Sequence, residues 1–563
     1  MKNLRARRLV DGYLHTKGRI IVNGNEEEII LAGWGAGSWN NPEGFMCGDI
    51  VREWTNSDPH AVPQRFDRAR TIEDSIRLLC GTEYAKKFWP RWYQNHLGEA
   101  DIKAMAELGY NSIRLPLNAR SFLPEEPGYQ WNEQSFAMLD QVIDWCEQYR
   151  LYVILDMHTA PGGQTGLKCD DGLESTPRFY LEPESVERFI ELWKKLAERY
   201  KERWIVGAYD LLNEPLAKPD TLSLIPQLKA LYQKLICEIR KIDQKHMLTI
   251  EGASAATNNE IFDQNYDEQC NNWCIHIHYY GFLPQVRSFY PYLEPSIRLN
   301  VPVWLGEGGG EAAEAGALLQ VAESLHMGFN LWGWKTALQE DGRALFHSPL
   351  KFRLPEGWSR VINSLNYGTP RPSYAECQQI FEQLLENIQY QNCEKDNEQH
   401  KYLLRQQGCT LQASAFDDAL ETGISFQGSW CYGNPYGFRT EDRMHLLLKD
   451  GALPPRTGNA FAKEEGFRTN KPLTHLLLQL DAGNFAEYTF YDVSQAALLN
   501  IWARAAEQGY LQIQWGEEKS EICLMPGTAF NKYTVNGVTP GEKVTIRIGV
   551  EHGSAQIEKL QLL

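Results

Sequence analysis

The stretch 204–215, WIVGAYDLLNEP, is a nearly continuous apolar run that ends on Asn213, Glu214 and a proline. A second run, VPVWLGEGGG at 301–310, carries Glu307 close to its end. Near-continuous apolar runs of this length are typical of parallel strands buried on both faces. We therefore expect each of two strands to carry one glutamate at its C-terminal end. The segment between them has room for several further strand–helix units, so the glutamates can meet only if the strands close into a barrel.

The same alternation of apolar strand and amphipathic helix runs from about residue 28 to residue 390. The helical segments place apolar residues at i, i+3, i+4 and i+7, as in 135–150 and 186–200. Eight alternating units predict an α/β fold, a (β/α)8 TIM barrel, rather than an open sheet. The expected strands are 28–35, 111–117, 151–158, 204–214, 246–252, 272–280, 301–308 and 328–335.

At 563 residues the chain is too long for one ordinary domain. After residue 392 the pattern changes to a polar stretch and then to short strands separated by Gly, Pro and Asn turns, which predicts an all-β sandwich. The connection 36–97 is long for a barrel loop, and we expect it to shape a pocket at the barrel mouth. The expected units are an N-terminal hairpin capping the barrel (1–27), the catalytic barrel (28–392), a linker (393–410) and the sandwich, a jelly roll (411–563).

Composition argues against several partners. The net charge is −17 and no long Lys/Arg cluster occurs, so we expect no nucleic-acid partner. No apolar run reaches the length of a membrane span, so we expect no membrane partner. The first residues lack an apolar signal core, which predicts a cytoplasmic protein, or a secreted one if a leader was removed. The twelve cysteines are scattered, and Cys270 and Cys274 lack the second pair of a zinc site, so we expect free thiols, no metal and no cofactor.

Polar and aromatic side chains gather where the expected strands end, which is the active face of such a barrel. Two carboxylates, a cation, an amide, imidazoles, a phenol and indoles would suit the binding and opening of a sugar acetal. A structural role accounts equally well for some of them: Asp156 and His276 could be satisfied by buried partners, and Trp34, Trp39, Trp334 and Lys335 could simply pack. The candidates are Trp34, Arg114, Asp156, His158, Asn213, Glu214, His276, His278, Tyr280, Glu307, Trp332, Trp334 and Lys335.

Four short motifs, in this order, resemble glycoside hydrolase family 5: Asn-Glu-Pro at 213–215, His-x-Tyr at 278–280, Gly-Glu at 306–307 and Trp-x-Trp at 332–334. The resemblance covers roughly residues 15–390. DMHTAPGGQTG (156–166) and LWGWKTA (331–337) are similar to the exo-β-1,3-glucanase branch of that family.

The resemblance implies a retaining mechanism, in which two carboxyl groups lie about 5–5.5 Å apart. Glu214 would be the acid and base, with a pKa raised by its environment, and Glu307 the nucleophile. Arg114 and Tyr280 would contact Glu307, and Asn213 would bond the sugar 2-OH. His158 and His278 would contact hydroxyls or orient the acid, and Trp332 would stack on the sugar. Apart from the resemblance, Trp34 and Lys335 are candidates for the pocket mouth because they lie near the ends of the first and last expected strands.

The region 480–563 is similar to the carbohydrate-binding jelly-roll modules found beside glycosidases. Exposed aromatics could bind sugar there; the domain could equally brace the barrel. The candidates are Trp430, Tyr432, Tyr436, Trp502 and Trp515.

Taken together, the sequence predicts a hydrolase of small glycosides or oligosaccharides that acts from one end of its substrate. Two alternatives stay open at this point. One is an endo-β-glycanase of the cellulase, β-glucanase or mannanase type, with a polysaccharide-binding module. The other is a carbohydrate-binding protein without catalytic activity.

Overall fold

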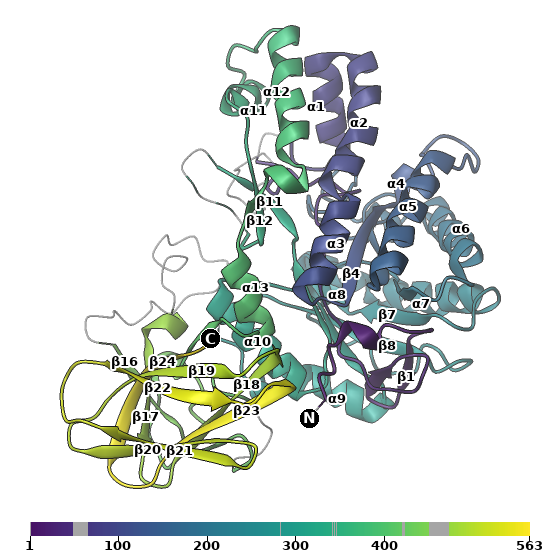
Figure 1. Cartoon of the computed structure of the whole chain (residues 1–563). Coiled ribbons are helices and arrows are strands. Elements are labelled where there is room, and N and C mark those ends of the chain that lie inside the picture. Colours follow the sequence, from purple (N-terminus) through teal and green to yellow (C-terminus); the bar gives the residue numbers. More distant parts are fainter. Residues whose placement is uncertain are drawn as a thin grey trace.

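A computed structural model describes residues 2–48, 66–281, 283–339, 342, 344, 346–418, 423–449 and 472–563. Within them, a closed parallel barrel is followed by an antiparallel β domain (Figure 1). This confirms the predicted fold class. Among the described residues, no helix combines the length and the apolar character needed to cross a membrane.

The barrel closes because β10 pairs in parallel with both β3 and β9. Its strands are almost wholly buried, as the near-continuous apolar runs predict. The strand 204–214 is shorter than expected: it ends at Asp210, and Asn213 and Glu214 lie in the loop that follows. The barrel strands are β3 Ala32–Gly35, β4 Ser112–Asn118, β5 Tyr152–Thr159, β6 Val206–Asp210, β7 Met247–Glu251, β8 Trp273–Tyr279, β9 Val303–Gly308 and β10 Phe329–Trp332.

Amphipathic helices cover the outside of the barrel (Figure 1). Their apolar residues face the strands, as in α6, where Phe189, Trp193 and Leu196 are buried. The helices of the barrel are α3 Glu99–Leu108, α4 Ala119–Phe122, α5 Glu133–Tyr149, α6 Pro183–Tyr200, α7 Ile225–Arg240, α8 Ala253–Ala256, α9 Tyr290–Leu299 and α10 Ala312–Ser324.

The long connection 36–97 forms helices of its own. α1 Ala69–Cys80 and α2 Thr82–His96 pack against α12 Tyr374–Asn387, and the three project together beside the barrel (Figure 1). Residues 49–65 of this connection lie outside the described part of the chain. After β10, the chain forms β11 Lys335–Leu338, β12 Leu350–Arg353 and α11 Trp358–Asn366, and β12 pairs with β13 Glu394–Lys395.

The first residues lie at the opposite end of the barrel from the strand-end side chains. β1 His15–Lys17 and β2 Ile20–Val22 form an antiparallel hairpin. The backbone N–H of Asp11 donates to the hydroxyl of Tyr152, the first residue of β5, at 3.0 Å. Thr16 contacts Asn271 and Asn272, just before β8. The hairpin is thus tied to the N-terminal ends of two barrel strands.

The C-terminal domain is a sandwich of two antiparallel sheets. Apolar residues alternate along each strand, as Leu511, Ile513 and Trp515 do in β20, and they face the other sheet. One sheet consists of β16 His445–Leu448, β17 Leu476–Asp481, β24 Ser554–Leu562, β19 Ala497–Arg504 and β22 Asn531–Val538, with β14 Thr410–Gln412 paired to β24. The other consists of β15 Phe426–Gln427, β18 Phe485–Val493, β23 Gly541–Val550, β20 Gly509–Trp515 and β21 Glu518–Leu524.

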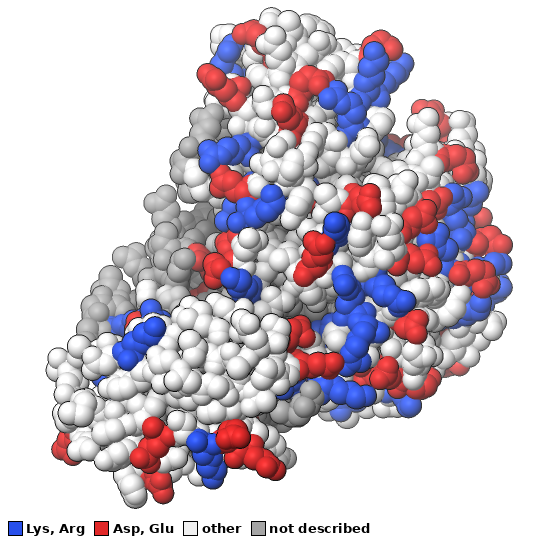
Figure 2. All heavy atoms as spheres, in the orientation of Figure 1, with Lys and Arg blue, Asp and Glu red and all other residues white. Residues whose placement is uncertain are grey.

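Barrel and sandwich share a packed boundary. Ala313 and Ala317 of α10 belong to the same apolar cluster as the sandwich core. The region expected as a linker contains α13 Asn397–Leu404, which packs against α10. Arg5 stacks on the ring of Tyr491 at 3.8 Å. Figure 2 shows acidic and basic side chains interspersed over the barrel helices, so the described charges on this face do not form one basic region.

Candidate active site

Glu214 and Glu307 lie close together around the imidazole of His278. In the parallel pairing of β8 with β9, His278 is in register with Glu307, immediately after a register shift at Ile277. His278 Nδ1 lies 2.9 Å from Glu214 Oε1 and 3.5 Å from Glu307 Oε2. One ligand atom from each of these three residues lies within 4.8 Å of the other two. The two carboxylates therefore meet, although they come from strands that are not neighbours in the barrel.

The loop after β6 delivers Glu214 to this position. The N–H of Leu211 donates to Thr249 in β7, and the N–H of Asn213 donates to Met157 in β5, so the chain stays between its neighbours past the strand end. Glu214 itself adopts a left-handed backbone conformation, with φ of 44°. A non-glycine residue in this region is uncommon and often marks a functional site.

Two donors fix Glu307. Its Oε1 accepts from Arg114 Nη1 at 2.5 Å, and its Oε2 accepts from the Tyr280 hydroxyl at 2.8 Å. Together the two contacts leave the orientation of the Glu307 carboxylate little freedom. The sequence-based hypothesis assigned these two partners to Glu307, and the structure brings all three together.

Arg114 is the buried cation of the site. Its guanidinium also donates to Asn213 Oδ1 at 2.8 Å and to Asp210 Oδ2 at 2.8 Å, and pairs with Asp156 at 3.1 Å. Burial alone would lower the pKa of Arg114, but Asp156, Asp210, Glu307 and Glu251 raise it well above its ordinary value. A fully buried arginine surrounded by carboxylates in this way keeps its charge.

The protonation of Glu214 differs from the sequence-based expectation. Burial alone would raise the pKa of Glu214, but the hydrogen bond with His278 and the charge of His278 bring that pKa below its ordinary value. For His278, burial would lower the pKa, but Glu307, Glu251 and Glu214 raise it well above the ordinary value. The expected rise in the pKa of Glu214 is therefore wrong, because the hydrogen bond with His278 and the charge of His278 outweigh the effect of burial.

His158 and Trp332 form one wall of the site. The two rings stack in parallel, with centroids 5.0 Å apart. His158 Nδ1 bonds to Asp156 at 2.7 Å, and burial and the charge of Arg114 lower the pKa of His158 to about 4. Gly35 makes room for the indole: a Cβ there would lie 2.3 Å from the Trp332 ring. Phe45 and Met46, from the connection after β3, pack on the same indole.

Trp34 and Lys335 do not reach this site. Strand alternation turns Gly33 and Gly35 inward and Trp34 outward, where it packs against Tyr110 and Trp334. Lys335 begins β11 after the chain has left the barrel. Its ammonium is buried against Asp101 at 2.8 Å and donates to the backbone carbonyls of His96 and Ile388. These contacts join the ends of α2 and α12 to the barrel, and we correct both predictions accordingly.

Three carboxylates near the site were not among the predicted site residues. Asp210 and Glu251 are the last residues of β6 and β7, so an acidic residue ending a buried strand was the available signal. Glu43 lies in the loop after β3, where the sequence gives no such signal. Burial and the charges of Glu307 and Glu214 raise the pKa of Glu43 well above its ordinary value.

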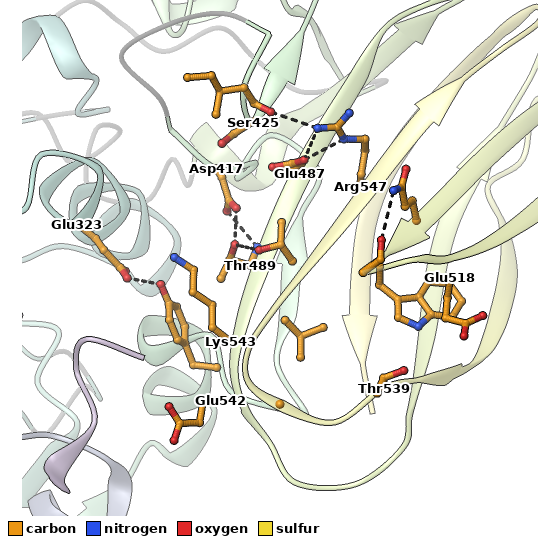
Figure 3. A pocket seen from close by; sticks show the side chains of 18 of the residues that line it. Glu323, Asp417, Ser425, Glu487, Thr489, Glu518, Thr539, Glu542, Lys543 and Arg547 are labelled. Carbon is orange, nitrogen blue, oxygen red and sulfur yellow. Dashed lines mark hydrogen bonds and ion pairs between the residues drawn. The ribbon is translucent and has the colours of Figure 1, made fainter. Parts of the chain in front are cut away.

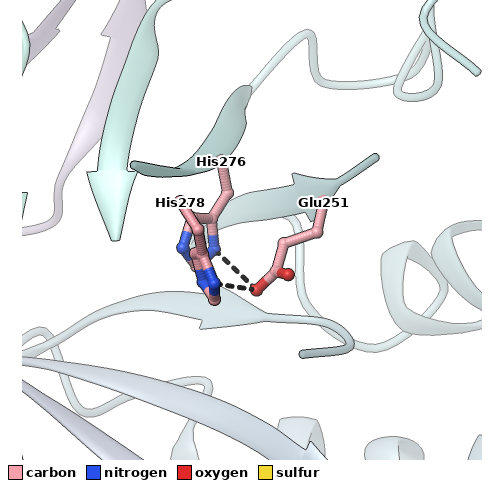
Figure 4. A group of neighbouring side chains, drawn as sticks. All are labelled: Glu251, His276 and His278. Carbon is pink, nitrogen blue, oxygen red and sulfur yellow. Dashed lines mark ion pairs between the residues drawn. The ribbon is translucent and has the colours of Figure 1, made fainter. Parts of the chain in front are cut away.

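Glu251, His276 and His278 form a cluster of possible metal ligands (Figure 4). Glu251 Oε1 lies 3.2 Å from His276 Nδ1 and 3.5 Å from His278 Nε2. The same oxygen lies 3.3 Å from the Arg114 guanidinium, which would repel a metal ion. His276 Nε2 faces Gly306, where a Cβ would lie 1.7 Å away. The cluster therefore fits a hydrogen-bonded ionic network better than a metal site.

A cavity of about 980 Å³ lies between the β18–β23 face of the sandwich and α10 (Figure 3). Its polar side chains pair with one another: Arg547 with Glu487, Thr489 with Asp417, and Tyr491 with Glu323 of α10. The last pair joins the two domains directly.

The aromatic candidates of the sandwich are dispersed. Trp515 lies in the core and Trp502 between Lys532 and Lys559. Trp430 stacks on His445 with ring centroids 3.6 Å apart, and Tyr432, 71% exposed, contacts the same indole. Tyr436 is partly buried against the sandwich core.

The similarity of this chain to known proteins includes its barrel region. A family model described as Cellulase (glycosyl hydrolase family 5) matches residues 77–337. A beta-xylosidase of Phanerodontia chrysosporium is 30% identical over 269 residues, and a probable glucan 1,3-beta-glucosidase A of Aspergillus fumigatus is 25% identical over 286 residues. Each match covers 48% of this chain, and the chain spans 52% and 66% of the length of these two relatives. The crystal structure of a rutinosidase from Aspergillus niger aligns with a TM-score of 0.42 at 15% identity, over 57% of this chain and 92% of that one.

Proposed function

We propose that the protein is a retaining β-glycosidase that hydrolyses O-glycosidic bonds by double displacement, on the premise that its barrel is of the glycosyl hydrolase family 5 type whose model matches residues 77–337. One observation carries the proposal: a carboxylate oxygen of Glu214 and one of Glu307 lie within 4.8 Å. Retaining enzymes hold their carboxyl groups about 5–5.5 Å apart, whereas inverting enzymes need about 6.5–9.5 Å to admit a water molecule.

In the first step, Glu307 attacks the anomeric carbon and forms a glycosyl ester as the bond to the leaving oxygen breaks. Arg114 and Tyr280 hold the carboxylate in the orientation for this attack. Glu214 delivers a proton to the departing oxygen. Asn213, whose Oδ1 is held by Arg114, is placed to bond the sugar 2-OH, and Trp332 offers its face to the ring.

The Glu214–His278 pair supplies that proton. At rest the pair holds it on His278, 2.9 Å from the Glu214 carboxylate, and transfer from Nδ1 to Oε1 turns Glu214 into the acid. In the second step Glu307 has lost its charge as an ester. Glu214 then takes a proton from water, whose oxygen attacks the anomeric carbon and releases Glu307. The pair is best treated as one coupled titrating unit.

We propose exo action on small β-linked glucosides or xylosides. Phe45 and Met46 pack against Trp332 and narrow the site on the side of the connection 36–97, and Glu43 adds a buried carboxylate there. The names of the two relatives, a beta-xylosidase and a glucan 1,3-beta-glucosidase, agree with terminal glucose or xylose. Endo action is the alternative, favoured by the description of the family model as Cellulase.

Nuclear magnetic resonance of the first product formed tests the proposal. A panel of nitrophenyl β-glycosides (glucose, xylose, mannose, galactose) identifies the sugar, and the substrate that turns over is then followed in deuterated buffer. We expect the β-anomer to appear first and the α-anomer only by mutarotation. Initial formation of the α-anomer, or no turnover of any glycoside in the panel, would overturn the proposal. Digestion of end-labelled oligosaccharides then separates exo from endo action.

A further inference from the structure

We propose that Glu251 is a positioning residue for the acid–base step. Its carboxylate holds the backbone of Glu214 with one oxygen and faces the imidazole of His278 with the other. The inference rests on the proposed function, because it assigns Glu251 a part in the work of Glu214. Glu251 contacts the acid and its proton donor rather than the sugar, so it acts through them.

The first contact anchors the acid. Glu251 ends β7 and is fully buried, and its Oε2 accepts the backbone N–H of Glu214 at 2.6 Å. That bond falls on the residue whose φ is 44°. A left-handed backbone is unfavourable for a non-glycine residue and persists only where its surroundings determine it. A short bond from an amide to a carboxylate is such a determinant.

The second contact orients the proton donor. Glu251 Oε1 lies 3.5 Å from His278 Nε2, on the far side of the ring from Glu214, and 3.2 Å from His276 Nδ1 (Figure 4). His278 Nδ1 then faces Glu214 Oε1 at 2.9 Å. Glu214, Glu251 and His278 therefore form a closed arrangement. Glu251 contacts the backbone N–H of Glu214 directly, and it contacts the Glu214 side chain indirectly, through the imidazole of His278. Carboxylates that orient a catalytic imidazole in this way are a recurring device.

Glu251 itself is anchored and has no free oxygen to offer a substrate. Oε1 is also 3.3 Å from Arg114, and the backbone carbonyl of Glu251 accepts the Tyr232 hydroxyl at 3.1 Å. A simpler role as a countercharge for Arg114 is the competing interpretation. Asp210 and Asp156 already pair with that guanidinium at 2.8 and 3.1 Å. The two interpretations predict different kinetics.

The test uses Glu251→Gln, which keeps the shape and an oxygen that can accept the Glu214 N–H but removes the charge facing His278. kcat/KM is measured on aryl β-glycosides with poor (phenyl) and good (2,4-dinitrophenyl) leaving groups, because only the former need a proton. We expect a loss of about 10- to 100-fold for phenyl and less than about threefold for dinitrophenyl glycosides. The basic limb of the pH profile should also move to lower pH, since Glu251 is one of the three carboxylates, with Glu307 and Glu214, that face His278.

Two matched variants make the result decisive. Asp267→Asn removes another buried carboxylate of the barrel, one paired with Arg240 at 2.8 Å, and should show no leaving-group dependence. Glu214→Ala defines the full dependence expected when the acid is lost. If Glu214→Ala shows the dependence and Glu251→Gln loses equally on both substrates, the positioning role is overturned while the proposed function stands. If Glu214→Ala shows none, the proposed function itself fails. If circular dichroism shows that Glu251→Gln does not fold, Glu251→Asp replaces it. That variant keeps the charge but shortens the reach to the Glu214 N–H, and it is measured and judged in the same way.

Discussion

An oxygen of Glu214 and an oxygen of Glu307 lie within 4.8 Å of one another, with one imidazole nitrogen of His278 as close to both. Two strands, β7 and β8, separate β6 from β9 in the barrel. The contact therefore depends on barrel closure and on the loop that carries Glu214 inward past the end of β6. This separation is shorter than the spacing of about 6.5–9.5 Å between the carboxyl groups of inverting enzymes.

Replacing the proposed nucleophile, Glu307, should abolish turnover without unfolding the protein. In Glu307→Gln the amide is nearly isosteric and can still contact Arg114 and Tyr280, so the thermal unfolding temperature should stay close to that of the native protein. We expect kcat to fall by roughly three orders of magnitude or more on every substrate. Steady-state kinetics measures the loss of kcat, and thermal unfolding followed by circular dichroism measures the stability. Near-normal activity would mean that another group attacks the anomeric carbon.

Removing the proposed acid, Glu214, should produce a loss of activity that depends on the leaving group. Glu214→Ala should retain much of the first step with a dinitrophenyl glycoside and lose about 10²- to 10⁴-fold with a phenyl glycoside. Azide, a nucleophile that needs no general base, should partly restore the second step and release a β-glycosyl azide. Rates that fall by one common factor for all leaving groups, with no azide adduct, would contradict the acid–base role.

The pH dependence should reflect the Glu214–His278 pair. Glu307, Glu251 and Glu214 outweigh the effect of burial and raise the pKa of His278 above its ordinary 6.5. Loss of that proton removes the source of acid, so kcat/KM should stay high through pH 6.5 and fall only as pH rises through the higher, folded-state pKa. Stability should follow the same sign: the contribution of this proton is complete below 6.5 and is lost as pH rises through the folded-state pKa. A basic limb below 6.5 would show that the pair does not hold the proton.

The sequence predicted the barrel strands and the residues that end them because both have local signals. A near-continuous apolar run predicts a buried parallel strand, and a single charged residue within it or near its end, such as Arg114 or Glu307, stands out against it. The predictions that Trp34 and Lys335 line the site were both wrong, and for one physical reason. Strand register and barrel closure decide which face of a strand a residue occupies and where the chain leaves the barrel. For strands buried on both sides, periodicity alone does not predict register or closure.

The charge state of the site lay further beyond the sequence. The pKa of Glu214 depends on a histidine from another strand, and that histidine depends on Glu251 and Glu307 from two more. No pattern along the chain encodes such a sum of long-range contacts. Glu43, in a loop without periodicity, was missed for a related reason: its burial becomes apparent only once the loop is folded over the barrel mouth.

Lys335 should matter for stability and little for chemistry. Lys335→Met leaves the buried Asp101 without its cation and two backbone carbonyls without a donor. Breaking a buried ion pair from one side typically costs about 3–5 kcal/mol. Urea unfolding should show that loss, while kcat/KM of the folded protein should change less than about threefold. Unchanged stability with a large loss of kcat/KM would return Lys335 to the site.

The sandwich should be required for a stable barrel. Deleting 411–563 would expose the apolar side of α10, where Ala313 and Ala317 pack in the sandwich core, and would remove the Tyr491 ring from Arg5. We expect the truncated chain to aggregate or to unfold at a markedly lower temperature, because a contiguous apolar surface becomes exposed to water.

Tyr491→Ala in the full chain should lower the unfolding temperature and leave kcat/KM nearly unchanged, since Tyr491 lies at the domain boundary and not among the contacts of Glu214 or Glu307. Tyr432→Ala serves as the control, because Tyr432 is 71% exposed on the same domain and should change neither quantity. A monomeric truncated barrel with native unfolding temperature and full activity would show that the two domains are independent and that the contacts of Arg5, Glu323 and Tyr491 contribute little to stability.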